Sequence, residues 1–184
     1  MKVNLFWDNS NIWIAGQGVC KTIEAGYEAA FRIHLQNLFD FALDNRHLEY
    51  GFVAGSVPPP SDDIWKRFAS LGVEVHKQER GALTGVEIAV DEIIHNKMME
   101  RMLDVEPQHI VLLTGDGSGY LEGKGFIKQL ERAIKHGWTI EVISWDHSCN
   151  PHLKAFAEAN GTYRSLNTAY NKVTFINNHR WASH

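Results

Sequence analysis

The sequence has few cysteines and no excess of positive charge, and each absence excludes a class of protein. Its 184 residues include two cysteines, Cys20 and Cys149. These are too few for a disulfide framework and lack the paired spacing of a zinc motif. We therefore expect reduced thiols and a cytoplasmic location. The net charge of −4 argues against a protein that holds nucleic acid by bulk positive potential.

Long hydrophobic runs are also lacking. No apolar stretch reaches the roughly 20 residues that a membrane-spanning helix needs. Met1 and Lys2 lead directly into a strand-like run rather than into a signal peptide. We therefore expect no membrane association. With 44% hydrophobic residues, the chain is long enough for one globular domain with a sizeable core.

Short apolar runs alternate with amphipathic segments along most of the chain. Strands are expected at residues 3–7, 48–54, 73–76, 109–113, 138–143 and 163–166. Helices are expected at residues 27–42, 61–70, 86–102, 126–134 and 153–159, and loops at residues 15–25 and 77–85. This alternation predicts an α/β fold with a mainly parallel sheet between two layers of helices.

The alternation weakens near the end of the chain. We expect one domain at residues 1–166 and a C-terminal extension at residues 167–184. Within the extension, residues 173–176 suit an edge strand, and a tail follows them.

The first strand and the polar residues after it organise the chain, in the stretch VNLFWDNSNIW. Its apolar part suits a strand that is buried on both faces of a parallel sheet. Asp8 follows at the carboxyl end of this strand, where ligands bind in open α/β sheets. Helix capping is the alternative role, because Asp, Asn and Ser favour helix starts and turns.

The strand at residues 109–113 ends in the same way, with Asp116 in the polar turn TGDGSG. If the two strands are neighbours, Asp8 and Asp116 face each other at a switch point of the sheet. Two carboxylates in one cleft repel each other. A hard divalent cation with oxygen ligands relieves this repulsion.

Two further acids belong to the long helix that precedes this strand. Glu87 and Asp91 are four residues apart and lie on one side of the helix, whereas Glu92 is expected to point to a different side. The helix dipole alone also favours acids in a first turn. Together with Asp8 and Asp116, these acids are expected to converge on one edge of the sheet.

Three motifs resemble the NYN-domain branch of the PIN-like nuclease superfamily: FWDNSN, GVEIAVDEI and LLTGDGSGY. The resemblance spans residues 3–143. It implies a Rossmann-like three-layer sandwich of strand order 3-2-1-4-5 and an endoribonuclease that cleaves RNA with Mg²⁺ or Mn²⁺. It also implies that Asp8 and Asp116 bind the metal, that Glu87 or Asp91 completes the acidic pocket, and that Asn11 holds a ligand water or a phosphate. The implied catalytic acids are Asp8, Asp91 and Asp116.

The turn after Asp116 departs from the family pattern. The family usually has a second Asp two residues later, where this chain has Ser118, and the turn is lengthened as far as Gly125. Glu122 is the candidate that supplies the missing carboxylate from the longer turn. A weakened or lost activity is the alternative.

Basic and aromatic residues near the expected strand ends are candidates for binding the substrate, which we expect to be single-stranded RNA. The basic ones are Lys77, Arg80, Lys124 and Arg32, and the aromatic ones, which suit stacking on bases, are Trp13, Tyr120 and Trp65. Ser118 and Asn11 are further candidates, as polar contacts to the RNA. Each has a simpler explanation as a solvated charge, a turn residue or a core aromatic. A homodimer stays open.

Two other functions stay open. A domain of the same fold that has lost catalysis would use the pocket to bind RNA, a nucleotide or a protein partner. The stretch DNSN after the first strand also resembles the metal loop of von Willebrand A domains. Those adhesion-type domains bind protein ligands through a metal.

Overall fold

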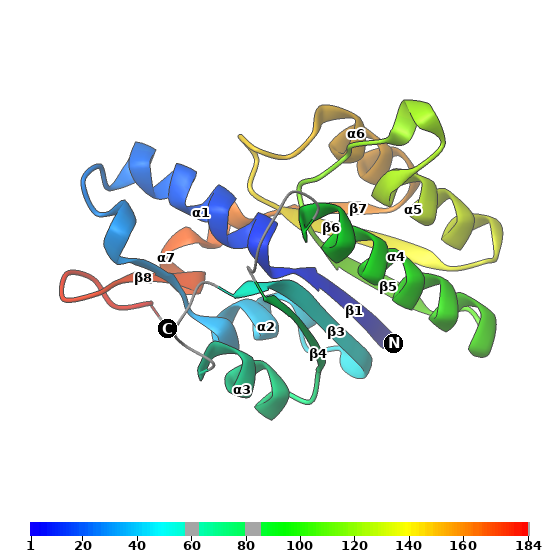
Figure 1. Ribbon diagram of the computed structural model, residues 1–184, viewed down its shortest axis with the longest axis horizontal. Helices are drawn as coiled ribbons and strands as arrows, with labels where there is room; N and C mark the ends of the chain where they lie inside the picture. The colour runs from blue at the N-terminus through cyan, green and yellow to red at the C-terminus, as the bar shows by residue number, and fades with distance from the viewer. Residues whose placement is uncertain (58–62, 80–85, 184) are drawn as a thin grey trace.

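The computed structural model is built on a parallel sheet of six strands between two layers of helices (Figure 1). It describes residues 1–57, 63–79 and 86–183, with the backbone alone for residues 56–57, 78–79 and 86–89. Across the sheet, the strands are β4 (Glu74–Glu79), β3 (His47–Val57), β1 (Lys2–Asp8), β5 (His109–Leu113), β6 (Thr139–Ser144) and β7 (Thr162–Ser165). Every neighbouring pair is parallel.

The observed sheet has one strand more than the predicted order of five strands, 3-2-1-4-5. The predicted strands correspond to β1, β3, β4, β5 and β6, and β7 adds a sixth strand beside β6. The strand expected at residues 163–166 therefore exists and extends the sheet at one edge. The α/β class and the parallel sheet are confirmed.

The helices divide between the two faces of the sheet. They are α1 (Asn9–Ile23), α2 (Leu35–Leu43), α3 (Asp63–Ser70), α4 (Val86–Asp104), α5 (Gly125–Lys135), α6 (Pro151–Asn160) and α7 (Tyr170–Val173). One hydrophobic core lies between the sheet and α1, α2, α3 and α7, and a second lies between the sheet and α4, α5 and α6. These two cores make the three layers seen in Figure 1.

Successive residues of β1 point to opposite faces of the sheet. Leu5 and Trp7 belong to the core beneath α1, α2 and α3, and Phe6 belongs to the core beneath α4, α5 and α6. Asp8 is two residues after Phe6 and therefore points to the same face of the sheet as Phe6. The strand itself therefore directs Asp8 toward the layer that contains α4 and α5.

The loop expected at residues 15–25 is wrong, because α1 begins directly after Asp8 and continues to Ile23. Gly16 and Gly18 suggested a loop, but both lie inside the helix. A Cβ atom on Gly16 would stand 2.7 Å from the Phe31 ring and 3.3 Å from the Trp145 ring. The glycine therefore permits close packing of the helix, which is a tertiary requirement that local sequence does not reveal.

The helix expected at residues 27–42 is also wrong in its first half. A short 3₁₀ turn, η1 (Glu28–Ala30), leads into β2 (Phe31–Ile33), and α2 begins only at Leu35. His34 sets this start, because its Nδ1 accepts a hydrogen bond from the backbone N–H of Asn37 at 3.2 Å. The apolar residues at helical spacing are shared between a strand and a helix.

Two further boundaries need correction. The loop expected at residues 77–85 is wrong at its start, because residues 77–79 belong to β4, and residues 80–85 lie outside the described residues. The edge strand expected at residues 173–176 is β8 (Thr174–Ile176), but it pairs antiparallel with β2 in a separate two-stranded sheet. It therefore does not extend the main sheet.

The C-terminal residues fold back onto the start of the chain. The backbone N–H of His34 donates to the carbonyl of Val173 at 2.8 Å. Near the end, the guanidinium of Arg180 forms a hydrogen-bonded ion pair with Glu24 at 2.9 Å. Tyr170 donates its hydroxyl to the same carboxylate at 2.7 Å. These contacts attach the extension to the end of α1.

None of the helices in the described ranges is long and apolar enough to cross a membrane. Both cysteines are free and buried.

Candidate functional site

The carboxyl ends of β1 and β5 lie side by side in the middle of the sheet. Trp7 pairs with Leu113 in the parallel register, and Asp8 and Thr114 are the next residues of their segments. From β1 the chain continues to β3 on one side, whereas β5 lies on the other side of β1. The strand order reverses at this point, and ligands of open α/β sheets bind at such a switch point.

Asp8 is a buried carboxylate at this switch point, with 4% of its surface exposed. Its Oδ1 accepts a hydrogen bond from the backbone N–H of Asn11 at 3.0 Å, so Asp8 caps α1 as the capping alternative predicts. Burial raises the pKa of Asp8 to about 6. Hydrogen bonds from Asn11 and Thr114 oppose part of this shift, and the neighbouring Asp116 carboxylate adds to it.

A network of hydrogen bonds joins Asp8 to the turn after β5. The hydroxyl of the fully buried Thr114 donates to Asp8 Oδ2 at 3.2 Å and accepts from the backbone N–H of Asp116 at 3.2 Å. The side-chain oxygen of Asn11 accepts from the backbone N–H of Gly115 at 2.8 Å. Asn11 therefore positions the turn, and its oxygen is already engaged within the protein.

Gly115 allows this turn to approach the next strand. A Cβ atom at this position would stand 2.8 Å from Ser144 Oγ and 3.2 Å from the carbonyl oxygen of Ser148. The turn that carries Asp116 is therefore fixed between α1 on one side and β6 on the other.

Asp116 is half-buried and is held through one of its two carboxylate oxygens. Oδ1 accepts hydrogen bonds from the backbone N–H of Ser118, at 2.8 Å, and from the Ser118 hydroxyl. Within the described part of the chain, nothing donates a hydrogen bond to Oδ2. Ser118 thus orients Asp116 and leaves one oxygen open.

A cleft of about 560 Å³ extends from Asp116 between α4 and α5. Its residues come from α4, from the turn after β5 with the 3₁₀ turn η2 (Tyr120–Glu122), and from α5. Four carboxylates line it: Asp91, Glu92, Asp116 and Glu122. Asp91 and Glu92 are neighbouring residues of α4, and both border this cleft.

Several of the predicted substrate-binding residues share this cleft, and others do not. Ser118 and Lys124 line it. Tyr120 packs partly against the second core and donates its hydroxyl to Glu131 at 3.0 Å. Trp13 packs partly against the first core, and Trp65 is buried in it. Packing against the cores, and for Tyr120 one hydrogen bond, therefore explains the positions of these three aromatic side chains without a bound nucleobase.

The remaining candidates lie on the flanks of the sheet or outside the described residues. Lys77 is exposed on β4 and lies opposite Gly55 in the register, close to the level of Asp8. Arg32 on β2 donates to the carbonyl oxygens of Ala29 and Phe31. Arg80 and the side chain of Glu87 lie outside the described residues.

Sequence reasoning missed several residues that line the cleft, among them His95, Gln129 and Arg132. His95 follows Asp91 by one turn of α4, and burial lowers its pKa to about 4, so the ring is neutral at pH 7. Gln129 has 6% of its surface exposed and lies among the apolar residues of α5. A glutamine amid the periodic apolar residues Phe126 and Leu130 is the signal that could have revealed it.

The acids at the switch point suit a small divalent cation that keeps part of its water shell. Among the described residues, no group of three His, Cys, Asp or Glu side chains is close enough to hold a metal. Mg²⁺ is usually held by one or two carboxylates together with waters and substrate phosphates, rather than by a cage of protein ligands. Asp8 and Asp116, with the open Oδ2 of Asp116, match that donor set.

Asn9 adds a further oxygen beside Asp8. It is the first residue of α1, has 7% of its surface exposed, and its Oδ1 has no hydrogen-bond partner among the described residues. Buried amide oxygens are rarely left without a partner. The donor chemistry of these residues therefore fits a cation that is held by two carboxylates, fewer than the sequence predicts.

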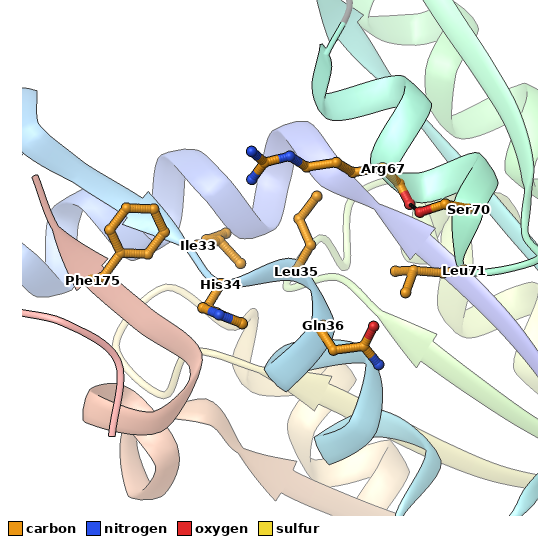
Figure 2. A pocket seen from close by; sticks show the side chains of 8 residues that line it. All are labelled: Ile33, His34, Leu35, Gln36, Arg67, Ser70, Leu71 and Phe175. Carbon is orange, nitrogen blue, oxygen red and sulfur yellow. Dashed lines mark hydrogen bonds between the residues drawn. The ribbon is translucent and has the colours of Figure 1, made fainter. Parts of the chain in front are cut away.

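A second hollow of about 170 Å³ lies among β2, α2, α3 and β8 (Figure 2). Its side chains are Ile33, His34, Leu35, Gln36, Arg67, Ser70, Leu71 and Phe175. None of these eight carries a carboxylate. This hollow is smaller than the cleft, and its helices α2 and α3 cover the face of the sheet opposite α4 and α5. The cleft beside Asp116 is the better candidate site.

No known protein family and no curated protein matches the chain in sequence comparisons.

Proposed function

We propose that the protein is a metal-dependent ribonuclease that hydrolyses RNA phosphodiester bonds at the switch point of the sheet. The observation that carries this proposal is the pair of Asp8 and Asp116. Asp8 is buried with a pKa raised to about 6, and Asp116 lies next to it with one open carboxylate oxygen. Acids with strongly raised pKa values cluster at functional sites, and this supports the proposal.

Asp8 and Asp116 are the residues that would hold Mg²⁺ or Mn²⁺. When bound, such an ion lowers the pKa of a coordinated water and neutralises negative charge that develops on the phosphate. Asp91 and Glu122 line the same cleft as Asp116 and add negative charge near the proposed ion. Asn9, the next residue along the chain, has a buried side-chain oxygen without a hydrogen-bond partner among the described residues.

The other residues of the site keep the two acids in place. Thr114 connects Asp8 Oδ2 to the backbone of Asp116, and Asn11 connects α1 to Gly115. Ser118 fixes the orientation of Asp116. Rigid support of this kind is what a catalytic site needs, because small displacements of catalytic groups cost much of the rate.

RNA is proposed as the substrate because the three motifs that resemble NYN nucleases contribute to this one edge of the sheet. Asp8 of the first motif ends β1, Asp91 of the second lies in α4, and Asp116 of the third follows β5. Lys124 and Arg132 at the cleft provide positive charge for a phosphate backbone. In a protein of net charge −4, this local charge is what brings the substrate to the acids.

The direct test is cleavage of a labelled single-stranded RNA with Mn²⁺ or Mg²⁺, and with EDTA as the metal-free control. We expect metal-dependent cleavage by the natural protein and a loss of at least about a hundredfold in Asp8→Asn. Asp104→Asn is the matched control, because Asp104 is an exposed acid at the far end of α4. Equal rates in Asp8→Asn and Asp104→Asn would refute the proposal.

A second function is favoured by one observation, the presence of Ser118 where the family has another acid. With two carboxylates instead of a larger set, the domain would bind a metal and RNA without cleaving it. Calorimetry with Mn²⁺ distinguishes the two functions. Metal binding that disappears in Asp8→Asn, with no RNA cleavage by the natural protein, would favour the binding module.

A further inference from the structure

The wall of the cleft between α4 and α5 contains two hydrogen-bonding atoms that the protein does not use. His95 Nε2 and Gln129 Oε1 are both buried and have no hydrogen-bond partner among the described residues. Both residues line the cleft that begins at Asp116. An unpaired buried polar atom costs free energy, so its retention on the wall of a cleft indicates a ligand that completes the bond.

The two side chains come from one contact between the helices. His95 packs edge-on against the ring of Phe126, with the ring centres 4.4 Å apart and an angle of 74° between the planes. Gln129 follows Phe126 by three residues on α5, so both lie on the same side of that helix. The packing of His95 against Phe126 therefore holds the imidazole and the amide on the same wall of the cleft. Contacts between α4 and α5 restrict the movement of both side chains.

Positive charge lies at the edge of the same cleft. Lys124 precedes α5, and Arg132 lies on α5 one turn after Gln129; both are exposed and line the cleft. No carboxylate in the described ranges forms an ion pair with either of them. Unpaired cations near a hydrogen-bonding wall are suited to phosphate groups that are attached to a polar ring.

These observations specify the ligand. Gln129 Oε1 requires an N–H or O–H donor, and an amide side chain bonds to the edge of a nucleobase through its oxygen and nitrogen together. The cleft volume of about 560 Å³ lies in the range of small-molecule sites. We propose that the cleft is a subsite for one nucleotide of the substrate, in which Gln129 and His95 hydrogen-bond the base and Lys124 and Arg132 contact its phosphates. This inference rests on the proposed function, because it places that nucleotide beside the acids of the cleavage site.

The test measures binding of the four nucleoside 5′-monophosphates to the metal-free protein by calorimetry in EDTA. Ribose 5-phosphate, which has the phosphate but no base, is the comparison ligand. At least one nucleotide is expected to bind about tenfold more tightly than ribose 5-phosphate, the worth of one or two hydrogen bonds to the base. Equal affinities for all five compounds, or no binding of any of them, would overturn the subsite.

Three variants separate recognition of the base from a structural role. Gln129→Leu removes the amide at nearly constant volume, and we expect it to lower nucleotide affinity about tenfold without changing that for ribose 5-phosphate. Arg132→Gln should weaken both ligands. Lys135→Gln, at an exposed position of α5 outside the cleft, should change neither. An unchanged nucleotide affinity in a folded Gln129→Leu variant would overturn the proposed contact.

The experiment also separates this inference from the proposed function. Binding in EDTA does not require the metal, so nucleotide binding is measured independently of RNA cleavage. Nucleotide binding without any RNA cleavage would refute the nuclease and support the subsite. RNA cleavage with equal affinities for nucleotides and ribose 5-phosphate would support the nuclease and overturn the subsite.

Discussion

The hydroxyl of Thr114 donates a hydrogen bond to Asp8 Oδ2 at 3.2 Å, and this bond joins the residue after β5 to the last residue of β1. The same hydroxyl accepts from the backbone N–H of Asp116. One buried side chain thus connects the two acids of the proposed site. The two acids come from strands about a hundred residues apart in the chain, and the switch point of the sheet brings them together.

Thr114→Val tests this connection, because valine has the shape of threonine without its hydroxyl. We expect the pKa of Asp8 to rise above its value of about 6, since one of the hydrogen bonds that favour its charged form is lost. The free energy of unfolding should fall by about 1–2 kcal/mol, because the N–H of Asp116 loses its partner. Carboxyl titration by NMR and urea denaturation measure the two effects. Thr114→Ser should retain both properties, and identical results for the Val and Ser variants would contradict the role of the hydroxyl.

Asp8→Asn should stabilise the metal-free protein at alkaline pH. The folded pKa of about 6 is higher than the ordinary value of 3.8, so the folded state favours the protonated acid, and stability falls as the pH rises through this interval. Asparagine removes the buried charge and keeps an oxygen that accepts from the N–H of Asn11. The gain should reach at most about 3 kcal/mol near pH 8 and vanish near pH 3.

Urea denaturation in EDTA at the two pH values measures this gain. A site kept for function typically costs stability in this way. A variant that is less stable than the natural protein at both pH values would show that Asp8 serves the fold rather than a ligand.

Glu141 lies on β6, on the side of β5 away from β1. Its effect on the pH dependence of stability should be opposite to that of Asp8. Burial by itself raises the pKa of Glu141, but hydrogen bonds from His109, Arg46 and Arg164 outweigh this effect and lower the pKa to about 2. Because the folded pKa is below the ordinary value of 4.5, this contribution to stability is complete above about pH 4.5 and is lost as the pH falls toward 2.

Glu141→Gln should therefore lower the free energy of unfolding at pH 7 by about 2–4 kcal/mol, because it leaves two partly buried guanidinium groups without their anion. Thermal unfolding measures this change. Glu49→Gln, which breaks a more exposed ion pair with Lys2, is the control and should cost no more than about 1 kcal/mol. A similar loss in both variants would contradict a special role for the buried network.

The sequence predicted the parts of the fold that have strong local signals. The apolar run of β1, the long helix α4 and the strand β5 each follow from periodicity alone, and all three are confirmed. Helix α1 was missed because Gly16 and Gly18 read as loop residues, whereas Gly16 makes room for Phe31 and Trp145. That requirement depends on residues distant in sequence, which a local pattern cannot show.

The two acids of the candidate site could be predicted from the sequence, but the hydrogen bonds around them could not. Asp8 ends one buried strand and Asp116 follows another, and this arrangement marks the carboxyl edge of a parallel sheet. The sequence could not show that Asn11 Oδ1 is occupied by the N–H of Gly115, or that Thr114 connects the acids. His95 and Gln129 were missed because a polar residue on a helix is ordinarily a surface residue, and only the packing of α4 against α5 shows their burial.

The rate of RNA cleavage as a function of pH tests the central claim most directly, with Mn²⁺ kept below saturation. Asp8 must lose its proton before it holds a cation, so the rate should rise about tenfold per pH unit up to about pH 6 and then level off. Asp8→Asn should show no cleavage at any pH, and Asp104→Asn should reproduce the natural profile. Cleavage by Asp8→Asn at the natural rate, or no cleavage by the natural protein across this range, would contradict the account.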